Sequence, residues 1–302
     1  MKKPCRLRAG DQIGIVAPCY AAEEEKITRA VRVLEAAGFQ VKLGENLFRN
    51  SWGFAASAEE RAADFNAMIR DPGVRMILFG GGEVGNELLP LIDYDALAAD
   101  PKILLSYSDG TTILEAVSSR CGICTYYGQS PRSFIQPGDF NRRHFDAAVC
   151  SGAPYTFPKG SEWVSLCPGS CEGVLTGGYL MNFAAMQGGT WYRMPDEPCI
   201  LFLEDMIHLN KPAAVSKWLS HIEQSGLFRQ VKGLLWGYYD DEPQPLVDDI
   251  LRRVGQRWNI PVVRCEDYGH GLRSGILPIG IRARLDAGAG TLILLEPTVD
   301  DA

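Results

Sequence analysis

Residues 103–112 read Ile-Leu-Leu-Ser-Tyr-Ser-Asp-Gly-Thr-Thr, and the apolar run at the start of this stretch predicts a short buried strand. Thr112-Ile-Leu-Glu-Ala-Val117 then predicts a helix that begins directly after a tight turn. A serine on such a turn, here Ser108, exposes its hydroxyl, and the amides at the helix start can stabilise a developing oxyanion. Ser108 is therefore a candidate nucleophile. The simpler alternative is that Ser108 or Asp109 only caps the helix, because both residue types often do so.

Strands and helices alternate along the chain before this stretch. Apolar or β-branched runs predict strands at residues 11–18, from residue 41 and at 74–79. Amphipathic segments predict helices at residues 21–37 and 57–70. This alternation predicts an α/β fold in which a mostly parallel N-terminal sheet is flanked by helices, with ligands beyond the carboxyl ends of its strands.

The second half of the chain has a weaker pattern. A segment rich in Gly, Pro and Ser follows residue 133, and strands are expected at residues 277–285 and 291–297, with a helix at 214–225. We therefore expect an N-terminal α/β domain that carries the nucleophile, a linker, and a smaller mixed α/β domain that carries the acid and the base. These three parts are assigned to residues 1–135, 136–170 and 171–302.

Composition limits the classes of function. The net charge of −7 argues against nucleic acid, because nucleic-acid binding depends on Lys and Arg that neutralise phosphates. No stretch approaches the roughly 18 apolar residues of a membrane span, and the Met-Lys-Lys-Pro start lacks the apolar segment of a signal peptide. We therefore expect a cytoplasmic protein with a small or peptide-like substrate, without nucleic-acid or membrane partners.

The nine cysteines are expected to be mostly free thiols, because the chain is large and the count is odd. Cys121-Gly-Ile-Cys124 has the spacing of a redox or zinc motif, but no second Cys pair or His pair accompanies it. No metal and no cofactor are therefore expected.

Two further polar residues complete a candidate catalytic set. Glu204 ends the apolar run 199–203, and His270 lies in a loop between two glycines. A serine hydroxyl is a weak nucleophile at neutral pH, so it needs an imidazole to take its proton and a carboxylate to orient that imidazole. Because neighbours on a strand face opposite ways, Asp205 is expected to point away from the site that Glu204 serves. The other histidines are expected at the surface: His144, His208 and His221.

Gly80-Gly-Gly82 follows the strand predicted at 74–79. Glycines allow the backbone to approach a ligand closely, so an amide in this loop could complete an oxyanion hole. A tight turn is the simpler interpretation. The loop lacks the Gly-Lys-Ser or Gly-Lys-Thr of a phosphate loop, and a dinucleotide fingerprint is poorly supported.

Several segments, taken in order, resemble the LD-carboxypeptidase family of serine peptidases (peptidase family S66) over nearly the whole chain. Each segment is weakly specific, but their order and spacing are hard to obtain by chance. The matching segments are Gly10-Asp-Gln-Ile-Gly-Ile-Val-Ala-Pro18, Glu60-Arg-Ala-Ala-Asp-Phe-Asn66, Gly81-Gly82 with Asn86-Glu-Leu-Leu-Pro-Leu-Ile-Asp-Tyr-Asp95, Tyr107-Ser-Asp109, Leu203-Glu-Asp205, and Gly269-His-Gly271 with Leu277-Pro-Ile-Gly280.

The resemblance implies a role for each candidate residue. Ser108 would be the nucleophile, His270 the base and Glu204 the orienting acid, with backbone amides at Gly82 and Asp109 as the oxyanion hole. It also implies a metal-free cytoplasmic homodimer whose N-terminal domain is similar to class I glutamine amidotransferases.

Two branches of that family imply two different substrates. Typical LD-carboxypeptidases trim the terminal D-alanine from murein tetrapeptides, and they carry an Arg-Gly-Gly-Tyr-Gly-like loop where this chain has Gly80-Gly-Gly-Glu-Val-Gly-Asn86. The latter resembles the branch of the microcin C immunity peptidase, which cleaves an aminoacyl sulfamoyl adenylate. Glu83, Asn86 and Trp163 are therefore candidate substrate-binding residues. The chain also departs from the usual family pattern at Ser106, Tyr179 and Lys217.

We expect hydrolysis of a terminal amide, with a murein peptide as the first candidate substrate and an aminoacyl adenylate as the second. An α/β-hydrolase acting on esters would share the Ser, acid, His order, but Ser106 replaces the first glycine of its Gly-x-Ser-x-Gly elbow. A binding protein descended from a peptidase, which retains such molecules without cleaving them, is the non-enzymatic alternative.

Overall fold

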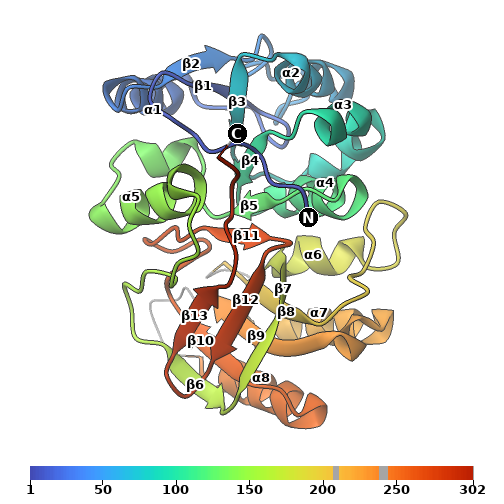
Figure 1. Ribbon diagram of the computed structural model, residues 1–302. Helices are drawn as coiled ribbons and strands as arrows, with labels where there is room; N and C mark the ends of the chain where they lie inside the picture. Colours follow the sequence, from blue (N-terminus) through green and yellow to red (C-terminus); the bar gives the residue numbers. More distant parts are fainter. Residues whose placement is uncertain (207–210, 238–243, 302) are drawn as a thin grey trace.

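Two β-sheets, one above the other in Figure 1, organise the residues that the computed structural model describes, which are 1–206, 211–237 and 244–301. Helices pack against both sheets, and the arrangement confirms the expected two-part α/β fold. His208, one of the histidines expected at the surface, lies outside the described residues.

The N-terminal sheet has six strands in the order β11-β5-β4-β3-β1-β2. All neighbours pair in parallel except β11, which runs antiparallel to β5 and comes from the C-terminal part of the chain. The apolar runs at residues 74–79 and 103–106, in the middle of this sheet, are almost fully buried, as strands covered on both faces require. The strands are β1 (Gln12–Val16), β2 (Gln40–Leu43), β3 (Val74–Phe79), β4 (Ile103–Ser106), β5 (Thr125–Tyr127) and β11 (Leu277–Ile279).

Helices connect these parallel strands, as the alternation predicted. Ser57 and Glu60 form the capping box that their spacing predicts, each side chain accepting from the other residue's amide. The helices are α1 (Glu24–Ala36), α2 (Ala58–Arg70), α3 (Tyr94–Ala99), α4 (Gly110–Cys121) and α5 (Asp139–Phe145), with 3₁₀ turns η1 (Gly85–Leu91) and η2 (Pro131–Phe134) and the π-helical turn η3 (Asp146–Ser151).

The C-terminal sheet has seven strands in the order β13-β12-β7-β8-β9-β10-β6. Its four central strands, β7 to β10, are parallel, and the outer strands pair antiparallel, so the expected mixed sheet is confirmed. The strands are β6 (Val164–Cys167), β7 (Ser170–Tyr179), β8 (Cys199–Glu204), β9 (Val231–Gly237), β10 (Val262–Cys265), β12 (Arg282–Asp286) and β13 (Thr291–Leu294). The helices are α6 (Leu180–Met186), α7 (Pro212–Ser225) and α8 (Pro245–Trp258), with the 3₁₀ turn η4 (Leu227–Arg229).

The single strand predicted at residues 277–285 is two strands. Gly280 adopts φ +86°, which turns the chain between β11 and β12. As a result, β11 completes the N-terminal sheet and β12 belongs to the C-terminal sheet. The segment 136–170 carries the helix α5 and the strand β6, so it is more regular than its composition indicated.

His144 is buried, so its prediction as a surface residue is wrong. Its Nε2 lies 2.9 Å from the Pro158 carbonyl oxygen, and its Nδ1 accepts from the Ile276 amide. Burial lowers the pKa of His144 to about 4, so the imidazole is a neutral packing group. His221 lies exposed on α7, as expected.

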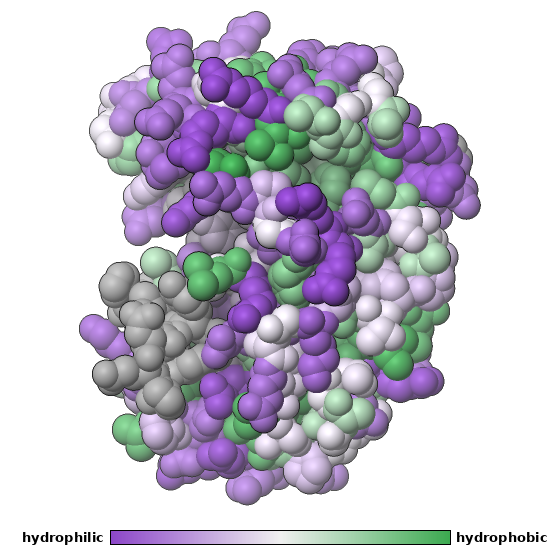
Figure 2. Space-filling view, turned by 90° about the vertical axis from the view of Figure 1, so that its left-hand side faces the viewer, coloured by the Kyte–Doolittle hydropathy of each residue, from purple (hydrophilic) through white to green (hydrophobic). Residues whose placement is uncertain are grey.

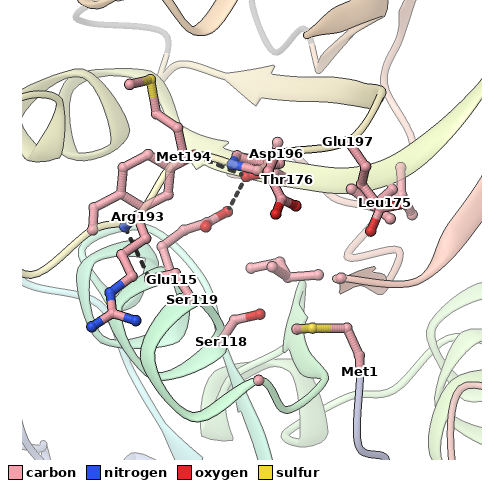
Figure 3. Close-up of a pocket in the computed structure, with 16 residues that line it drawn as sticks. Met1, Glu115, Ser118, Ser119, Leu175, Thr176, Arg193, Met194, Asp196 and Glu197 are labelled. Carbon is pink, nitrogen blue, oxygen red and sulfur yellow. Dashed lines mark hydrogen bonds between the residues drawn. The ribbon is translucent and has the colours of Figure 1, made fainter.

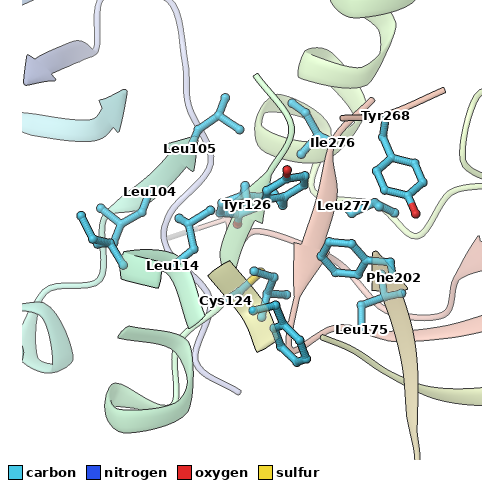
Figure 4. Close-up of a cluster of buried hydrophobic side chains, with 14 of the residues drawn as sticks. Leu104, Leu105, Leu114, Cys124, Tyr126, Leu175, Phe202, Tyr268, Ile276 and Leu277 are labelled. Carbon is cyan, nitrogen blue, oxygen red and sulfur yellow. The ribbon is translucent and has the colours of Figure 1, made fainter. Parts of the chain in front are cut away.

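One hydrophobic core joins the two sheets. Figure 4 shows Leu104 of β4 and Tyr126 of β5 in a cluster that continues through Leu277 of β11 to Phe202 of β8. Because the core continues from one sheet to the other, side-chain packing fixes the position of the two sheets relative to each other. All nine cysteines are free thiols, and among the described helices none has the length and apolarity of a membrane span.

Candidate active site

Ser108 lies on the turn between β4 and α4, where its sequence context placed it. Its φ of +57° is in the left-handed region, which is uncommon for a residue with a side chain. A left-handed residue costs on the order of 1 kcal/mol, and such strain is found where a turn must present a functional group. The side chain of Ser108 is 8% exposed, so the hydroxyl is almost covered but reachable.

The departure at Ser106 is compatible with this turn because residue 110 is glycine. A Cβ on Gly110 would lie 2.1 Å from the Ser106 Oγ and 2.7 Å from its Cβ. Two side chains cannot occupy this space, so a serine at the first position of the elbow requires a glycine at the second.

Glu204 is the last residue of β8, at the centre of the C-terminal sheet. Its carboxylate is 1% exposed and accepts a hydrogen bond from the hydroxyl of Tyr127, at the end of β5. The same hydroxyl accepts from the Ser108 amide at 3.1 Å. Tyr127 therefore links the carboxylate to the backbone of the serine turn, a contact that sequence reasoning did not identify.

His270 lies on the loop between β10 and β11. Hydrogen bonds of the residues before His270 attach this loop to the rest of the C-terminal half. The Tyr268 hydroxyl lies 2.8 Å from the carbonyl oxygens of Leu203 and Leu235, at the carboxyl ends of β8 and β9. The Asp267 carboxylate is fully buried and accepts a hydrogen bond from the indole of Trp163 at 2.8 Å. These contacts hold the loop against the sheet beside Glu204.

The three candidate catalytic side chains meet. The Ser108 Oγ lies 3.0 Å from Nε2 of His270, and Nδ1 of the same ring lies 2.9 and 3.0 Å from the two Glu204 oxygens. Burial alone lowers the pKa of His270, but the charge and hydrogen bond of Glu204, with a contribution from Asp205, raise it above its ordinary value. The ring therefore has the geometry of a base between a hydroxyl and a carboxylate.

Two tyrosines flank the imidazole. The ring centroids of Tyr107 and Tyr179 lie 5.1 and 5.0 Å from that of His270. Tyr179 is one of the departures from the family pattern, and its buried hydroxyl has no hydrogen-bond partner in the described part of the chain. The rings limit rotation of the imidazole and narrow the access to it.

The predicted oxyanion loop lies against the serine. A Cβ on Gly81 would lie 2.5 Å from the Ser108 Cβ and 2.9 Å from its Oγ, so only glycine allows this approach. Within residues 1–206, 211–237 and 244–301, the amides of Gly82 and Asp109 have no internal hydrogen-bond partner. Both amides are thus available to an acceptor beside Ser108.

Asp109 does not cap the helix with its side chain. Its carboxylate accepts from the Gly85 amide at 2.7 Å and from the Asn182 side chain. The simpler alternative, that the Asp109 side chain only caps the helix, is therefore wrong. Asp109 ties the serine turn to the loop after β3 and to α6.

Asp205 is buried beside the site, although strand alternation predicted that it would face away. It is 3% exposed, and burial, followed by the charge of Glu204, raises its pKa to about 7. The alternation rule does not reach this residue because β8 ends at Glu204. A second acid whose protonation changes near neutral pH is thus electrostatically coupled to the imidazole.

The three candidate substrate-binding residues lie in different places. Glu83 is exposed on the loop after β3 and accepts from the Tyr20 hydroxyl at 2.8 Å. Burial raises the pKa of Asp109, and the charge of Glu83 adds to that increase. Asn86 is exposed on η1. Trp163 is 7% exposed in the hydrophobic core, where its indole supports Asp267. Lys217 lies exposed on α7, beside the ring of Trp218.

The surface is hollowed between the N-terminal and C-terminal halves of the molecule, as Figure 2 shows. A cavity of about 560 Å³ adjoins His270 at this junction. Its lining comes from α1, from Tyr107, from residues 128–141 and from the loop 269–274. Among the described residues, no cluster of three or more His, Cys, Asp or Glu could hold a metal ion.

Two family models match the chain. One describes the LD-carboxypeptidase N-terminal domain and matches residues 13–128, which include Ser108. The other describes the LD-carboxypeptidase C-terminal domain and matches residues 172–285, which include Glu204 and His270.

Individual relatives agree with these models. A provisionally named carboxypeptidase of Streptomyces coelicolor is 31% identical and aligned over 98% of this chain and 97% of its own. The microcin C7 self-immunity protein MccF, solved with aspartyl sulfamoyl adenosine, is 25% identical, with a TM-score of 0.89 over 99% of this chain and all of its own. The muramoyltetrapeptide carboxypeptidase of Oxalobacter formigenes is 28% identical, with a TM-score of 0.79 over 94% of this chain and 97% of its own. The chain therefore belongs to the LD-carboxypeptidase family, the peptidases of family S66.

Proposed function

We propose that this protein is a serine carboxypeptidase that hydrolyses the terminal amide of a murein peptide through Ser108, His270 and Glu204. The observation that carries the proposal is the pair of contacts on one imidazole, with Nε2 at 3.0 Å from the Ser108 hydroxyl and Nδ1 on the Glu204 carboxylate. This arrangement suits acyl transfer, because the base is both in contact with the nucleophile and oriented by an acid.

In the first step, His270 takes the proton of Ser108 and the serine oxygen attacks the carbonyl carbon of the terminal amide. The negative charge that develops on the carbonyl oxygen is stabilised by the amides of Gly82 and Asp109, which have no hydrogen-bond partner among the described residues. Collapse of the tetrahedral intermediate breaks the carbon–nitrogen bond. His270 gives its proton to the leaving amine, and an ester to Ser108 remains.

In the second step, a water molecule replaces the departed amine. His270 takes a proton from this water, which attacks the ester carbonyl, and the imidazolium then protonates the serine oxygen as it leaves. The acyl fragment is released as a carboxylic acid. Glu204 keeps its charge throughout and stabilises the imidazolium in both steps.

The family description and the likeness to a muramoyltetrapeptide carboxypeptidase support a murein peptide as the substrate. The burial of Trp163 also favours this choice over a nucleotide. Among the described residues, no tryptophan lines the cavity beside His270, and Trp163 packs in the core.

Cleavage of an aminoacyl sulfamoyl nucleotide is the second candidate function. The observation that favours it is the overall likeness to MccF, whose TM-score of 0.89 exceeds that of the muramoyltetrapeptide carboxypeptidase. The exposed Glu83 and Asn86 beside the oxyanion loop are available to such a substrate.

The two functions are separated by incubating the protein with a murein tetrapeptide and with aspartyl sulfamoyl adenosine and following the products by mass. We expect release of the terminal alanine from the tetrapeptide at the higher kcat/KM. Preference for the sulfamoyl nucleotide would favour the second candidate. Tight binding of either compound without cleavage would instead indicate a binding protein of peptidase descent.

The proposal includes a homodimer in the cytoplasm, as the family resemblance implies. Sedimentation velocity at micromolar concentration tests the dimer. A species near the mass of one chain, 33.2 kDa, at all concentrations would contradict it.

A further inference from the structure

The cavity beside His270 has an unusual charge. In a chain with seven more acidic than basic residues, the residues that line this cavity include the guanidinium groups of Arg29 and Arg132 and no carboxylate. Hydroxyl and amide groups supply most of the remaining polar lining: Ser130, Ser133, Gln136, Asn141 and Ser274. Such a lining favours an anion over a cation or an apolar group.

The two arginines come from separate parts of the fold. Arg29 lies on α1, and Arg132 lies on η2, directly after the strand β5 that ends at Tyr127. Neither guanidinium forms an ion pair or a side-chain hydrogen bond with any described residue. Within the described part of the chain, both donor sets are therefore free to bind a ligand, and no ion pair must break first.

Arg132 is electrostatically coupled to the ring that flanks the base. Burial raises the pKa of the Tyr107 phenol, and the charge of Arg132 acts in the opposite direction. The Tyr107 ring centroid in turn lies 5.1 Å from that of His270. Tyr107, Arg132 and His270 all line the cavity, so the positive charge lies in the cavity that adjoins the base.

The reaction itself determines which half of the substrate reaches this side. His270 must protonate the leaving amine, so the leaving fragment lies next to Nε2 of the imidazole. In a carboxypeptidase this fragment is one amino acid, whose α-carboxylate is two bonds from the amine nitrogen. A carboxylate held just beyond the imidazole would enter the cavity that contains the arginines.

We propose that Arg132, together with Arg29, forms an anion subsite that binds the carboxylate of the released amino acid; the inference rests on the proposed carboxypeptidase function. The subsite makes the enzyme specific for the free carboxyl end of a peptide. The subsite has no carboxylate to bind when the leaving fragment is one such as sulfamoyl adenosine.

The test compares two peptides and a nucleotide. The peptides are the tetrapeptide L-Ala-γ-D-Glu-meso-diaminopimelyl-D-Ala with a free carboxyl end and the same peptide ending in the amide. The nucleotide is aspartyl sulfamoyl adenosine. The variants are Arg132→Gln and Arg29→Gln, and each has a matched control that removes the same charge from an exposed arginine outside the cavity lining, Arg143→Gln on α5 and Arg32→Gln on α1.

For the free tetrapeptide, Arg132→Gln should raise KM by roughly 10- to 100-fold and change kcat little, since a charged hydrogen bond made in both ground and transition states is lost. The wild-type protein should prefer the free peptide over the amide by a similar factor, and Arg132→Gln should abolish that preference. Arg29→Gln should act in the same direction. Both control variants should behave as wild type with all three compounds.

Equal cleavage of the acid and the amide by the wild-type protein, or Arg132→Gln kinetics that match Arg143→Gln, would overturn the subsite and leave the peptidase function standing. If the wild-type protein cleaves neither peptide, the peptidase function fails. Calorimetric titration of Ser108→Ala with both peptides then decides the subsite. Preferential binding of the acid that Arg132→Gln removes would support it, and binding without that preference, or no binding, would overturn it.

Discussion

The hydroxyl of Tyr127 donates a hydrogen bond to the carboxylate of Glu204, across the junction between the two sheets. Because this hydroxyl also accepts from the Ser108 amide, one side chain connects the acid to the turn of the nucleophile. The distance between the acid and the nucleophile therefore depends on how the two halves of the molecule are placed relative to each other.

Replacing Tyr127 with Phe should lower kcat by roughly 10- to 100-fold. The variant removes a hydrogen bond to a buried carboxylate and leaves the Ser108 amide without a partner, and each loss costs on the order of 1 to 3 kcal/mol. Steady-state kinetics measures the effect. Tyr126→Phe is the matched control, since the neighbouring buried hydroxyl donates to the Thr298 carbonyl rather than to Glu204. It should reduce the free energy of unfolding and leave kcat within a few-fold of wild type. Equal kcat values for the two variants would contradict the role of Tyr127.

Ser106 and Gly110 should behave as a coupled pair. Gly110→Ala places a methyl group 2.1 Å from the Ser106 Oγ, so we expect a loss of stability on the order of 1 to 3 kcal/mol and a loss of activity through the displaced serine turn. Adding Ser106→Gly removes both atoms of the clash and should recover part of each loss. A double-mutant cycle of urea unfolding measures this coupling. Additive effects of the two substitutions would show that the contact between Ser106 and the added methyl group does not cause the loss of stability.

The activity should fall on the acid side as His270 gains a proton. Because the pKa of His270 is raised above its ordinary value of 6.5, the neutral base is lost as the pH falls through that raised value. Asp205 contributes to the increase, so Asp205→Asn should move the acid limb of the kcat/KM profile to lower pH. Asp249→Asn, on the exposed face of α8, is the control and should leave the limb in place. An unchanged limb in Asp205→Asn would contradict the coupling.

Glu115 should make the fold less stable as the pH rises. This carboxyl reaches from α4 to accept hydrogen bonds from the Thr176 hydroxyl and the Gly177 amide of β7, and Figure 3 shows the contact with Thr176 beside a cavity. Burial raises its pKa from 4.5 to about 8. Between these values the folded protein holds a proton that the unfolded chain releases, so the free energy of unfolding falls with increasing pH.

Glu115→Gln keeps an acceptor for both donors but cannot ionise. The variant should therefore lose less stability than wild type between about pH 5 and about pH 9, by on the order of 1.4 kcal/mol for each pKa unit of the shift. Urea unfolding at both pH values measures the difference. Parallel pH dependence in the two proteins would mean that Glu115 is not the titrating group.

Local sequence signals predicted the serine turn and most of the parallel strands. The strand 103–106, the turn at Ser108 and the helix behind it depend on neighbours in the chain, and the capping box of Ser57 depends on a residue three positions away. The prediction failed where one residue redirects the chain, as Gly280 does between β11 and β12. Such a turn is a conformational choice that an apolar run does not reveal.

The contacts that complete the site could not be read from local patterns. Tyr127 meets Glu204 only because the folded chain brings the end of β5 and the end of β8 together, and Asp205 is buried although it lies beyond the end of its strand. Trp163 resembled a substrate-binding aromatic in sequence, but its partner Asp267 is more than one hundred positions away. Burial of a polar or aromatic side chain depends on such long-range contacts, which a single sequence does not display.

The most direct test of the account compares kcat for Ser108→Ala and Ser106→Ala on the murein tetrapeptide. Ser106 ends β4 and Ser108 lies on the turn that follows, so both substitutions remove one hydroxyl from the same short stretch, but of the two described hydroxyls it is that of Ser108 that contacts the imidazole. Loss of the nucleophile should reduce kcat by roughly a millionfold, whereas Ser106→Ala should stay within about tenfold of wild type. Near-normal turnover by folded Ser108→Ala would contradict the claim that this hydroxyl attacks the substrate.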